Sequence, residues 1–271
     1  MEDTKVKEDV LATFDTVAKA YDQVPFFKTS AQYIQEMIDL EPDAKILDVA
    51  CGTGNVILQL ASKFKDANFL GVDIAQAMLD VAVTKSHALG LNNTAFDCRD
   101  IEQLDMNVKF DLITCSYAMF FLPNPVDTLK LLVALLEVGG ELIFTTFTDE
   151  AFSPSSQILI EELQNYGIAL EDKDAPDWKQ LTSKEQILQL CEKAGVKAES
   201  IEVRDIRYPM NVTQWWELKM STGYRGMINE LSDVAFDTVK QNYFKKMQEY
   251  TNASNEVMLI ADTLFTKIVK A

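Results

Sequence analysis

The strongest constraint on the fold of this chain is a glycine turn that stands between a short apolar run and an apolar helical pattern. Residues 46–55 read Ile-Leu-Asp-Val-Ala-Cys-Gly-Thr-Gly-Asn, and residues 56–61 continue with Val-Ile-Leu-Gln-Leu-Ala. This order predicts a strand, a tight turn and a helix. Because the backbone N–H groups of such a turn and of the helix N-terminus face the ligand above them, the segment indicates a nucleotide-binding site.

The spacing of the glycines narrows the choice of nucleotide. The dinucleotide fingerprint G-x-G-x-x-G needs a third glycine, but after Gly52 and Gly54 that position is Ile57. The chain also lacks the G-x-x-x-x-G-K-[ST] pattern of a Walker-type phosphate loop. The pattern therefore argues against NAD, FAD and nucleoside triphosphates.

Two aspartates stand at the ends of predicted strands, where ligands bind in open α/β sheets. Asp48 lies four residues before Gly52 and is placed to attract a cationic group near the glycine turn. Asp73 lies nineteen residues after Gly54 and ends the next apolar run. A carboxylate at the tip of the second strand can accept hydrogen bonds from both hydroxyls of a ribose.

Together with two later segments, these residues resemble the class I S-adenosylmethionine (SAM) dependent methyltransferases. Within that family the chain is most similar to the ubiquinone/menaquinone-biosynthesis-like small-molecule enzymes. Four segments carry the resemblance in the family's order: Leu-Asp-Val-Ala-Cys-Gly-Thr-Gly at 47–54, Gly-Val-Asp-Ile at 71–74 with Met78 behind it, Asp-Cys-Arg-Asp-Ile at 97–101, and Phe-Asp-Leu-Ile-Thr-Cys-Ser-Tyr at 110–117. The resemblance covers residues 14–147 well and residues 183–210 loosely.

The resemblance implies a cofactor, a reaction and a set of contact residues. SAM is the expected cofactor, S-adenosylhomocysteine the product, and no metal is expected. The methyl group would pass to a small-molecule acceptor by direct SN2 displacement, mainly through positioning and desolvation. The expected cofactor-binding residues are Tyr21, Asp48, Ala50, Gly52, Gly54, Asp73, Ile74, Met78, Asp100, Ile101 and Ser116.

Some of these roles have a competing interpretation. Tyr21 resembles the family's N-terminal Tyr-Asp element, which folds over the cofactor, although it also suits ordinary packing at a helix end. Asp100 would accept a hydrogen bond from the adenine amine while Ile101 covers the ring, and Asp97 is the rival carboxylate. Met78 suits the hydrophobic core as well as an adenine contact.

The acceptor side is less sharply defined. Six residues are expected to line it: Tyr117, Phe121, Trp215, Trp216, Tyr224 and Arg225. The aromatic residues favour an aromatic or lipid-like acceptor, whereas Arg225 would clamp a carboxylate or phosphate, unless it is an exposed residue at a helix end. The identity of the acceptor therefore stays open.

The sequence offers few candidates for a general base. The only histidine, His87, falls near the end of a predicted helix, several turns from the strand tips, and is expected at the surface. A histidine-driven mechanism is therefore disfavoured. The remaining candidates are Asp22, Tyr224 and the two expected catalytic residues, Tyr21 and Tyr117, or no base at all.

The alternation of apolar runs predicts an α/β fold with a doubly wound, Rossmann-like sheet. Strands are expected at 45–50, 68–73, 94–98, 110–116, 141–147, 200–208 and 257–268, and the resemblance makes the last of these seven strands antiparallel. We expect a single methyltransferase domain over 1–271. Its parts are N-terminal helices over the cofactor (1–40), a SAM-binding core (41–147), cap or lid insertions (148–181 and 211–256) and the final strand (257–271). The aromatic and methionine-rich segment 211–256 would otherwise be a packing helix or a dimer interface.

The charge balance limits the partners. There are 42 acidic and 25 basic residues, which give a formal net charge of −17. Because binding to nucleic acids or anionic membranes needs phosphate-neutralising charge, neither is expected as a stable partner. The four cysteines show no metal-ligand spacing, which favours reduced thiols and a cytoplasmic protein, with a homodimer left open. Two alternative functions remain: a protein methyltransferase acting on a basic partner, and a non-catalytic regulatory module that binds SAM or its product.

Overall fold

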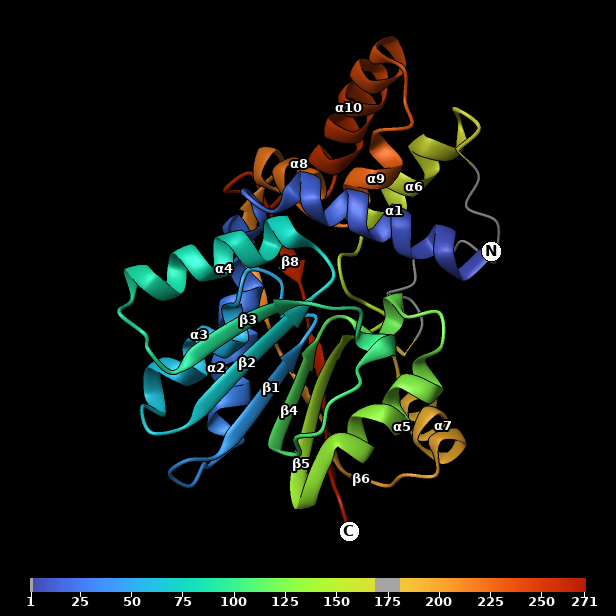
Figure 1. The fold of residues 1–271 in the computed structure, drawn as a ribbon. Helices are drawn as coiled ribbons and strands as arrows, with labels where there is room; N and C mark the ends of the chain where they lie inside the picture. Colours follow the sequence, from blue (N-terminus) through green and yellow to red (C-terminus); the bar gives the residue numbers. More distant parts are fainter. Residues whose placement is uncertain (1, 169–180) are drawn as a thin grey trace.

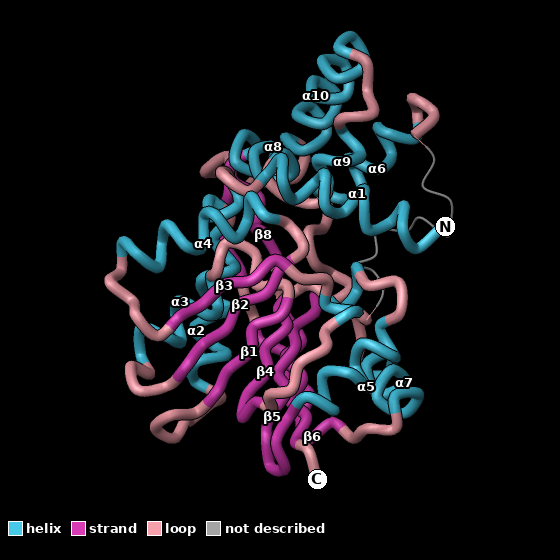
Figure 2. Tube along the Cα trace, viewed as in Figure 1, coloured by secondary structure: helices cyan, strands magenta, loops and turns pink. Residues whose placement is uncertain are grey.

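Seven strands form one twisted sheet in the computed structural model, which describes residues 2–168 and 181–271 (Figures 1 and 2). The strands are β1 (Lys45–Val49), β2 (Asn68–Asp73), β3 (Thr94–Cys98), β4 (Phe110–Ser116), β5 (Leu136–Phe147), β6 (Ala198–Arg204) and β9 (Thr263–Val269). Their order is β3-β2-β1-β4-β5-β9-β6, and only the pairs that contain β9 are antiparallel. The prediction of a doubly wound, Rossmann-like sheet with an antiparallel last strand is confirmed.

The order of the strands reverses between β1 and β4, and this reversal positions the site. The chain adds β2 and β3 on one side of β1, and then β4 and β5 on the other. In open parallel sheets such a reversal opens a crevice at the carboxyl ends of the strands. The glycine turn directly follows β1, and Ser116 ends β4, so segments far apart in the sequence meet at this point.

Helices cover both faces of the sheet. One face carries α2 (Pro25–Glu36), α3 (Asn55–Lys63) and α4 (Gln76–Ala88), and the opposite face carries α5 (Pro125–Leu135) and α7 (Lys184–Ala194) (Figure 1). Because side chains alternate along a strand, β1 supplies both layers. Ile46 packs in the hydrophobic cluster of α2 and α3, and Leu47 in that of α5 and α7.

The N-terminal helices lie above the edge at which the parallel strands end. Helix α1 (Glu2–Val17) runs across this edge and packs against α4 on one side and the cap helix α9 (Tyr224–Ile228) on the other. The approach to α9 is close, because a Cβ placed on Gly226 would lie 2.8 Å from the Thr13 hydroxyl oxygen. A single turn, η1 (Tyr21–Gln23), then leads to Pro25, which starts α2.

A second hydrophobic cluster lies in a helical cap beyond the sheet. The cap consists of α6 (Ser155–Gln164), α8 (Val212–Met220), α9, α10 (Asp233–Gln248) and the antiparallel ribbon of β7 (Arg207–Asn211) and β8 (Glu256–Ile260). In Figure 1 it stands above the carboxyl ends of the strands. Residues 169–180, part of the predicted insertion 148–181, lie outside the described residues.

Two predicted strands are each divided between the sheet and the cap. The run 200–208 contains the end of β6 and the start of β7, and the run 257–268 contains most of β8 and most of β9. Only β9 is therefore the antiparallel strand of the sheet, whereas β8 pairs with β7. Periodicity did not reveal the divisions, because each connection is only two residues long: 205–206 between β6 and β7, and 261–262 between β8 and β9.

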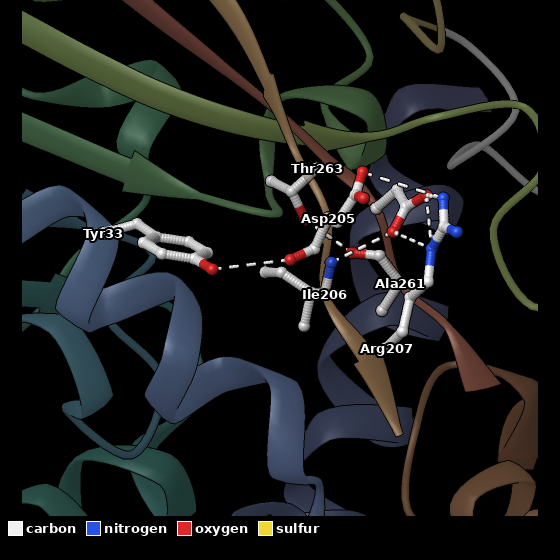
Figure 3. Close-up of polar contacts among 7 residues, drawn as sticks. Tyr33, Asp205, Ile206, Arg207, Ala261 and Thr263 are labelled. Carbon is white, nitrogen blue, oxygen red and sulfur yellow. Dashed lines mark hydrogen bonds and ion pairs between the residues drawn. The ribbon is translucent and has the colours of Figure 1, made fainter. Parts of the chain in front are cut away.

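The two connections lie side by side (Figure 3), and both contact one carboxylate, that of Asp262. Asp262, between β8 and β9, is 5% exposed and accepts a hydrogen bond of 3.0 Å from the Ile206 backbone N–H. It also accepts bonds from Arg207 Nε (3.1 Å) and Nη2 (2.5 Å). The Ala261 N–H donates to the Ile206 carbonyl at 2.8 Å. We call this group the Asp262 clasp.

Within the described ranges, no helix combines the length and the apolar character that crossing a membrane requires.

Candidate active site

Two adjoining cavities open at the carboxyl ends of β1, β2 and β4. The inner cavity has a volume of about 390 Å³ and reaches α2, and the outer cavity has a volume of about 800 Å³ and reaches α1 and α4; both volumes include space open to solvent. Five residues line both cavities: Tyr21, Ala50, Gly52, Ser116 and Tyr117.

The glycine turn forms the floor between the two cavities. Gly54 adopts φ +82° at the N-terminus of α3, and a Cβ there would lie 3.1 Å from Leu58 and 3.2 Å from Ala82. Gly52 has φ +54°, a backbone conformation that residues other than glycine rarely adopt. Its N–H donates to Asp73 Oδ2 at 2.8 Å. The turn thus needs both glycines and is fixed to the end of β2.

Asp73 lines the outer cavity. Its Oδ2 accepts from Gly52, and its Oδ1 accepts from the Ala75 N–H at 2.9 Å. Burial raises the pKa of this carboxyl, although its backbone hydrogen bonds oppose the shift. Because an ionised carboxylate offers about four acceptor positions, Asp73 retains capacity for two further donors from a ligand.

The inner cavity contains buried polar atoms without partners. They are Asp48 Oδ2 and Ser116 Oγ, whereas the Ser30 hydroxyl faces that of Tyr117. Asp48 is 2% exposed, and its Oδ1 accepts a bond of 2.6 Å from the Thr114 hydroxyl. Burial raises the pKa of Asp48 to about 7. Since buried polar groups in folded proteins nearly always have partners, these atoms indicate a polar ligand that brings a cation to Asp48.

The outer cavity has apolar walls and one acidic corner. Ile74, Met78 and Ile101 line it, and the buried Met78 also packs under α1 in the hydrophobic core. Asp100 begins the turn η2 (Ile101–Gln103) and accepts from the Glu102 N–H at 2.9 Å. The rival carboxylate, Asp97, pairs with Arg99 at 2.6 Å and lines neither cavity.

The Tyr-Asp element at residues 21–22 closes over the glycine turn. Asp22 accepts from the Thr53 hydroxyl and from Asn55 Nδ2 (3.1 Å), and it pairs with Lys85 at 2.7 Å. This attachment places the Tyr21 ring 3.9 Å from the position of a Cβ on Gly52. The ring also stacks on Phe27, with 4.5 Å between centroids.

Tyr117 lies where the acceptor side begins. Its backbone has φ +53°, which is rare for an aromatic residue, and its ring stacks on Phe147 at 4.3 Å. Burial raises the pKa of both Tyr117 and Tyr21 above the ordinary value. Both phenols therefore stay protonated at neutral pH, which suits hydrogen bonding better than proton abstraction.

A cluster of aromatic rings separates these cavities from the cap. Tyr117 lies at one end of it, and Phe26, Phe147 and Phe152 continue it toward the cap helices. Phe152 is also held at φ +63°, so two bulky residues of one cluster adopt the left-handed conformation. Such outliers persist where the surroundings dictate the direction of a side chain, and they concentrate at functional sites.

The expected acceptor residues divide between cavity and cap. Phe121, in the turn η3 (Met119–Phe121), lines the outer cavity with Tyr117. The other four, Trp215, Trp216, Tyr224 and Arg225, belong to α8 and α9 and line neither cavity. Trp215 is fully buried and donates to the Val257 carbonyl at 3.2 Å. The apolar stripe that suggested a ligand surface thus also forms the interior of the cap.

One buried cation in the cap was not singled out from the sequence. Lys219 on α8 has no exposed surface, and its Nζ donates to Ser156 Oγ at 2.8 Å. The nitrogen lies 3.7 Å from the centroid of the Tyr224 ring and 5.3 Å from that of Phe152. No described residue supplies it with a carboxylate, and burial lowers its pKa well below the ordinary value.

Further lining residues were also missed. Phe27, Ser30 and Asn55 line the inner cavity, and Val10, Phe14 and Arg99 line the outer one. The aromatic pair that follows Pro25 was the available signal for α2. No pattern marked Ser30, because its role depends on how α2 packs beside the glycine turn.

Comparison with known proteins agrees with this geometry. A family model described as a methyltransferase domain matches residues 40–195. A malonyl-[acyl-carrier protein] O-methyltransferase from Acetivibrio thermocellus is 30% identical over 181 residues, which cover 66% of this chain and 62% of that protein. A ubiquinone biosynthesis O-methyltransferase from Coxiella burnetii is 31% identical over 179 residues, covering 65% of this chain and 72% of that protein. The matched part spans less than two thirds of the malonyl-[acyl-carrier protein] enzyme's length.

The fold has close counterparts among solved structures. A SAM-dependent methyltransferase from Geobacter sulfurreducens in complex with S-adenosyl-L-homocysteine aligns with a TM-score of 0.58 at 15% identity, covering 95% of this chain and 98% of that one. At this identity the likeness concerns the fold alone.

Proposed function

The chain belongs to the class I SAM-dependent methyltransferases, and we propose that it transfers the methyl group of SAM to a small-molecule acceptor. The relatives are named as O-methyltransferases of small or carrier-bound acids and of a quinone pathway, which supports an oxygen acceptor. The transfer needs little chemical assistance from the protein, because a methyl group on a sulfonium is already activated. Alignment and exclusion of water are then the protein's main contributions.

The residues present fit SAM in two parts. The outer cavity would hold the adenosine, with Asp73 accepting from the ribose hydroxyls, Asp100 near the adenine amine and Ile101 against the ring. The inner cavity would hold the amino-acid end, with its ammonium group near Asp48. Ser116, which lines both cavities, would stand between the two parts.

The observation that carries this proposal is the set of unpartnered atoms in the inner cavity. A buried carboxylate oxygen without a donor destabilises a protein, by about 1–3 kcal/mol or more for a charged group. At Asp48 an ammonium group of the ligand would provide the missing donor and the missing charge. The same ligand could then donate to the hydroxyl oxygen of Ser116.

The acceptor would enter between Tyr117, Phe121 and the cap. The aromatic cluster fills this space in the described conformation, so we propose that the cap insertions act as a lid that moves when the acceptor binds. Tyr224 and Arg225 would then contribute from α9, which begins against Phe121: a Cβ on Gly223 would lie 3.7 Å from that ring. We also propose that the protein is cytoplasmic, and the proposal is compatible with a monomer or a homodimer.

Titration calorimetry with SAM tests the cofactor site. Asp73→Ala removes two charge-assisted hydrogen bonds, so SAM binding should weaken by about 2–4 kcal/mol. Asp39→Ala is the control, because Asp39 is an exposed carboxylate that lines neither cavity, and its affinity should equal that of the wild type. Equal affinity for Asp73→Ala would contradict the ribose assignment.

A label-transfer assay tests the reaction. The protein is incubated with methyl-labelled SAM and a cell extract that is then divided into metabolite, protein and nucleic-acid fractions. Label in the metabolite fraction that is lost with Gly52→Arg supports the proposal. Label in the protein fraction would favour the protein methyltransferase instead. SAM binding without any transferred label would favour the regulatory module.

A further inference from the structure

The hydroxyl of Tyr117 is held by the connection between β8 and β9. Its oxygen lies 2.8 Å from Thr263 Oγ1, and either oxygen could be the donor in that pair. Thr263 Oγ1 also lies 2.8 Å from the Ala261 carbonyl, which can only accept. Tyr117 therefore shares a hydrogen-bond network with the residues next to the Asp262 clasp.

Tyr117 is poorly suited to removing a proton from an acceptor. A neutral phenol is a very weak base, and its hydrogen bond with Thr263 adds no negative charge to it. Burial raises the pKa of Tyr117, which disfavours the phenolate that would be basic. Burial also raises the pKa of Tyr21, the second tyrosine of the site, and the negative charge of Asp73 raises it further.

The other ionisable groups that line the cavities belong to the cofactor side. Asp48, Asp73 and Asp100 surround the proposed positions of the ammonium, ribose and adenine. Arg99 is paired with Asp97, and burial raises the pKa of the Cys51 thiol. Among the described lining residues there is no histidine, lysine or glutamate, and His87 is exposed on α4.

We propose that the acceptor atom is a carboxylate oxygen and that the product is a methyl ester. This inference rests on the proposed function and names its substrate class. A carboxylic acid, with an ordinary pKa of about 4, is already ionised at neutral pH, whereas a phenol or an alcohol would need a base. The carboxylate oxygen forms the new O–CH3 bond as the S–CH3 bond breaks, and the electron pair of the broken bond neutralises the sulfonium. No proton moves.

An unpaired guanidinium on α9 supports an anionic acceptor. Among the described residues, Arg225 Nη1 donates to Met220 Sδ at 3.2 Å, and Arg225 Nε is buried without a partner. No carboxylate of the described residues pairs with it, although acidic residues outnumber basic ones in the chain. Arg225 follows two residues after Gly223, where a Cβ would lie 3.7 Å from the ring of Phe121, a residue of the outer cavity.

Alkali treatment of the labelled metabolite fraction tests the acceptor class without knowledge of the acceptor. Methyl esters hydrolyse in mild alkali and release volatile labelled methanol, whereas methyl ethers, N-methyl and C-methyl groups keep the label. We expect most of the label to be lost as methanol. Label that survives alkali would overturn the carboxylate proposal and leave the methyltransferase proposal standing. Absence of label from every fraction would instead count against the proposed function.

Tyr117→Phe supplies a second readout through the pH profile of transfer to the same metabolite fraction. Loss of the hydroxyl should lower kcat/KM by less than about tenfold and leave the shape of the pH profile unchanged, because general acid–base catalysis by a residue is worth about 100- to 10,000-fold. A hundredfold loss with a displaced basic limb would show that Tyr117 acts as the base. Tyr250→Phe, at an exposed tyrosine that lines neither cavity, is the matched control.

Discussion

Replacing Lys219 with methionine should stabilise the protein. The Lys219 side chain is fully buried, has no acidic partner among the described residues, and makes one hydrogen bond, to Ser156. Methionine has a similar length and no branches, so it can occupy the same channel among the aromatic rings. Ser156 would keep its hydrogen bond with the Tyr224 hydroxyl.

The magnitude follows from two opposing changes. The variant loses one hydrogen bond, worth about 0.5–1.5 kcal/mol, and removes the desolvation of an incompletely bonded amine, which costs about 1–3 kcal/mol. Wild-type folding at neutral pH also requires the lysine to lose its proton or to bury it, at about 1.4 kcal/mol for each unit by which the pKa is lowered. We therefore expect a net stabilisation of about 1–3 kcal/mol at pH 7.

The pH dependence provides the sharper test. Because the pKa of Lys219 is lowered by burial, the unfolded state binds more protons than the folded state at pH values below about 10.4, the ordinary lysine value. Wild-type stability from this group therefore rises with pH, and the advantage of Lys219→Met should shrink between about pH 7 and pH 10. Urea unfolding at several pH values measures it, with the exposed Lys245→Met as control. A less stable variant, or a difference that is constant with pH, would refute the reasoning.

Two further predictions concern the cofactor side. Burial raises the pKa of Asp48 to about 7. Below that pH, SAM affinity should therefore rise by up to about tenfold per pH unit as the carboxylate ionises. Asp48→Asn should remove this pH dependence, which calorimetry near pH 6 and pH 8 measures. The same raised pKa makes the ligand-free protein less stable as pH rises from about 4 to 7, which Asp48→Asn should also abolish. Asp22→Asn should weaken SAM binding by about tenfold, because it loosens Tyr21 over Gly52. The unfolding free energy should change little, since the Asp22–Lys85 pair is partly exposed. Undiminished affinity would show that the Tyr-Asp element does not help to hold the cofactor.

The cofactor side could be predicted from the sequence because its determinants are local. A strand that runs into a turn with Gly52 and Gly54, and a second strand that ends at Asp73, lie within about thirty residues of each other and supply the floor and one wall of the proposed cofactor cavities. The order of these segments also determined the parallel part of the sheet. In the structure the glycine turn and the end of the second strand meet, and the Gly52 N–H donates to Asp73.

The acceptor side depends on contacts between distant segments. A helical stripe with Trp215 and Trp216 has the same periodicity whether it faces a ligand or another helix, so the sequence could not separate these roles. Tyr117 finds its hydrogen-bond partner in Thr263, 146 residues away. The burial of Lys219 is also hidden, because lysine in a helical pattern is ordinarily a surface residue.

The Asp262 clasp joins the sheet and the β7–β8 ribbon of the cap at one hydrogen-bonded group. Both passages between the sheet and the β7–β8 ribbon run through a single carboxylate, and the next residue, Thr263, holds the Tyr117 hydroxyl. Insertions or substitutions in the parts of the cap that lie away from this clasp can therefore accumulate without disturbing the glycine turn or Asp73. New acceptor preferences can thus arise in the cap while the sheet keeps the proposed cofactor site.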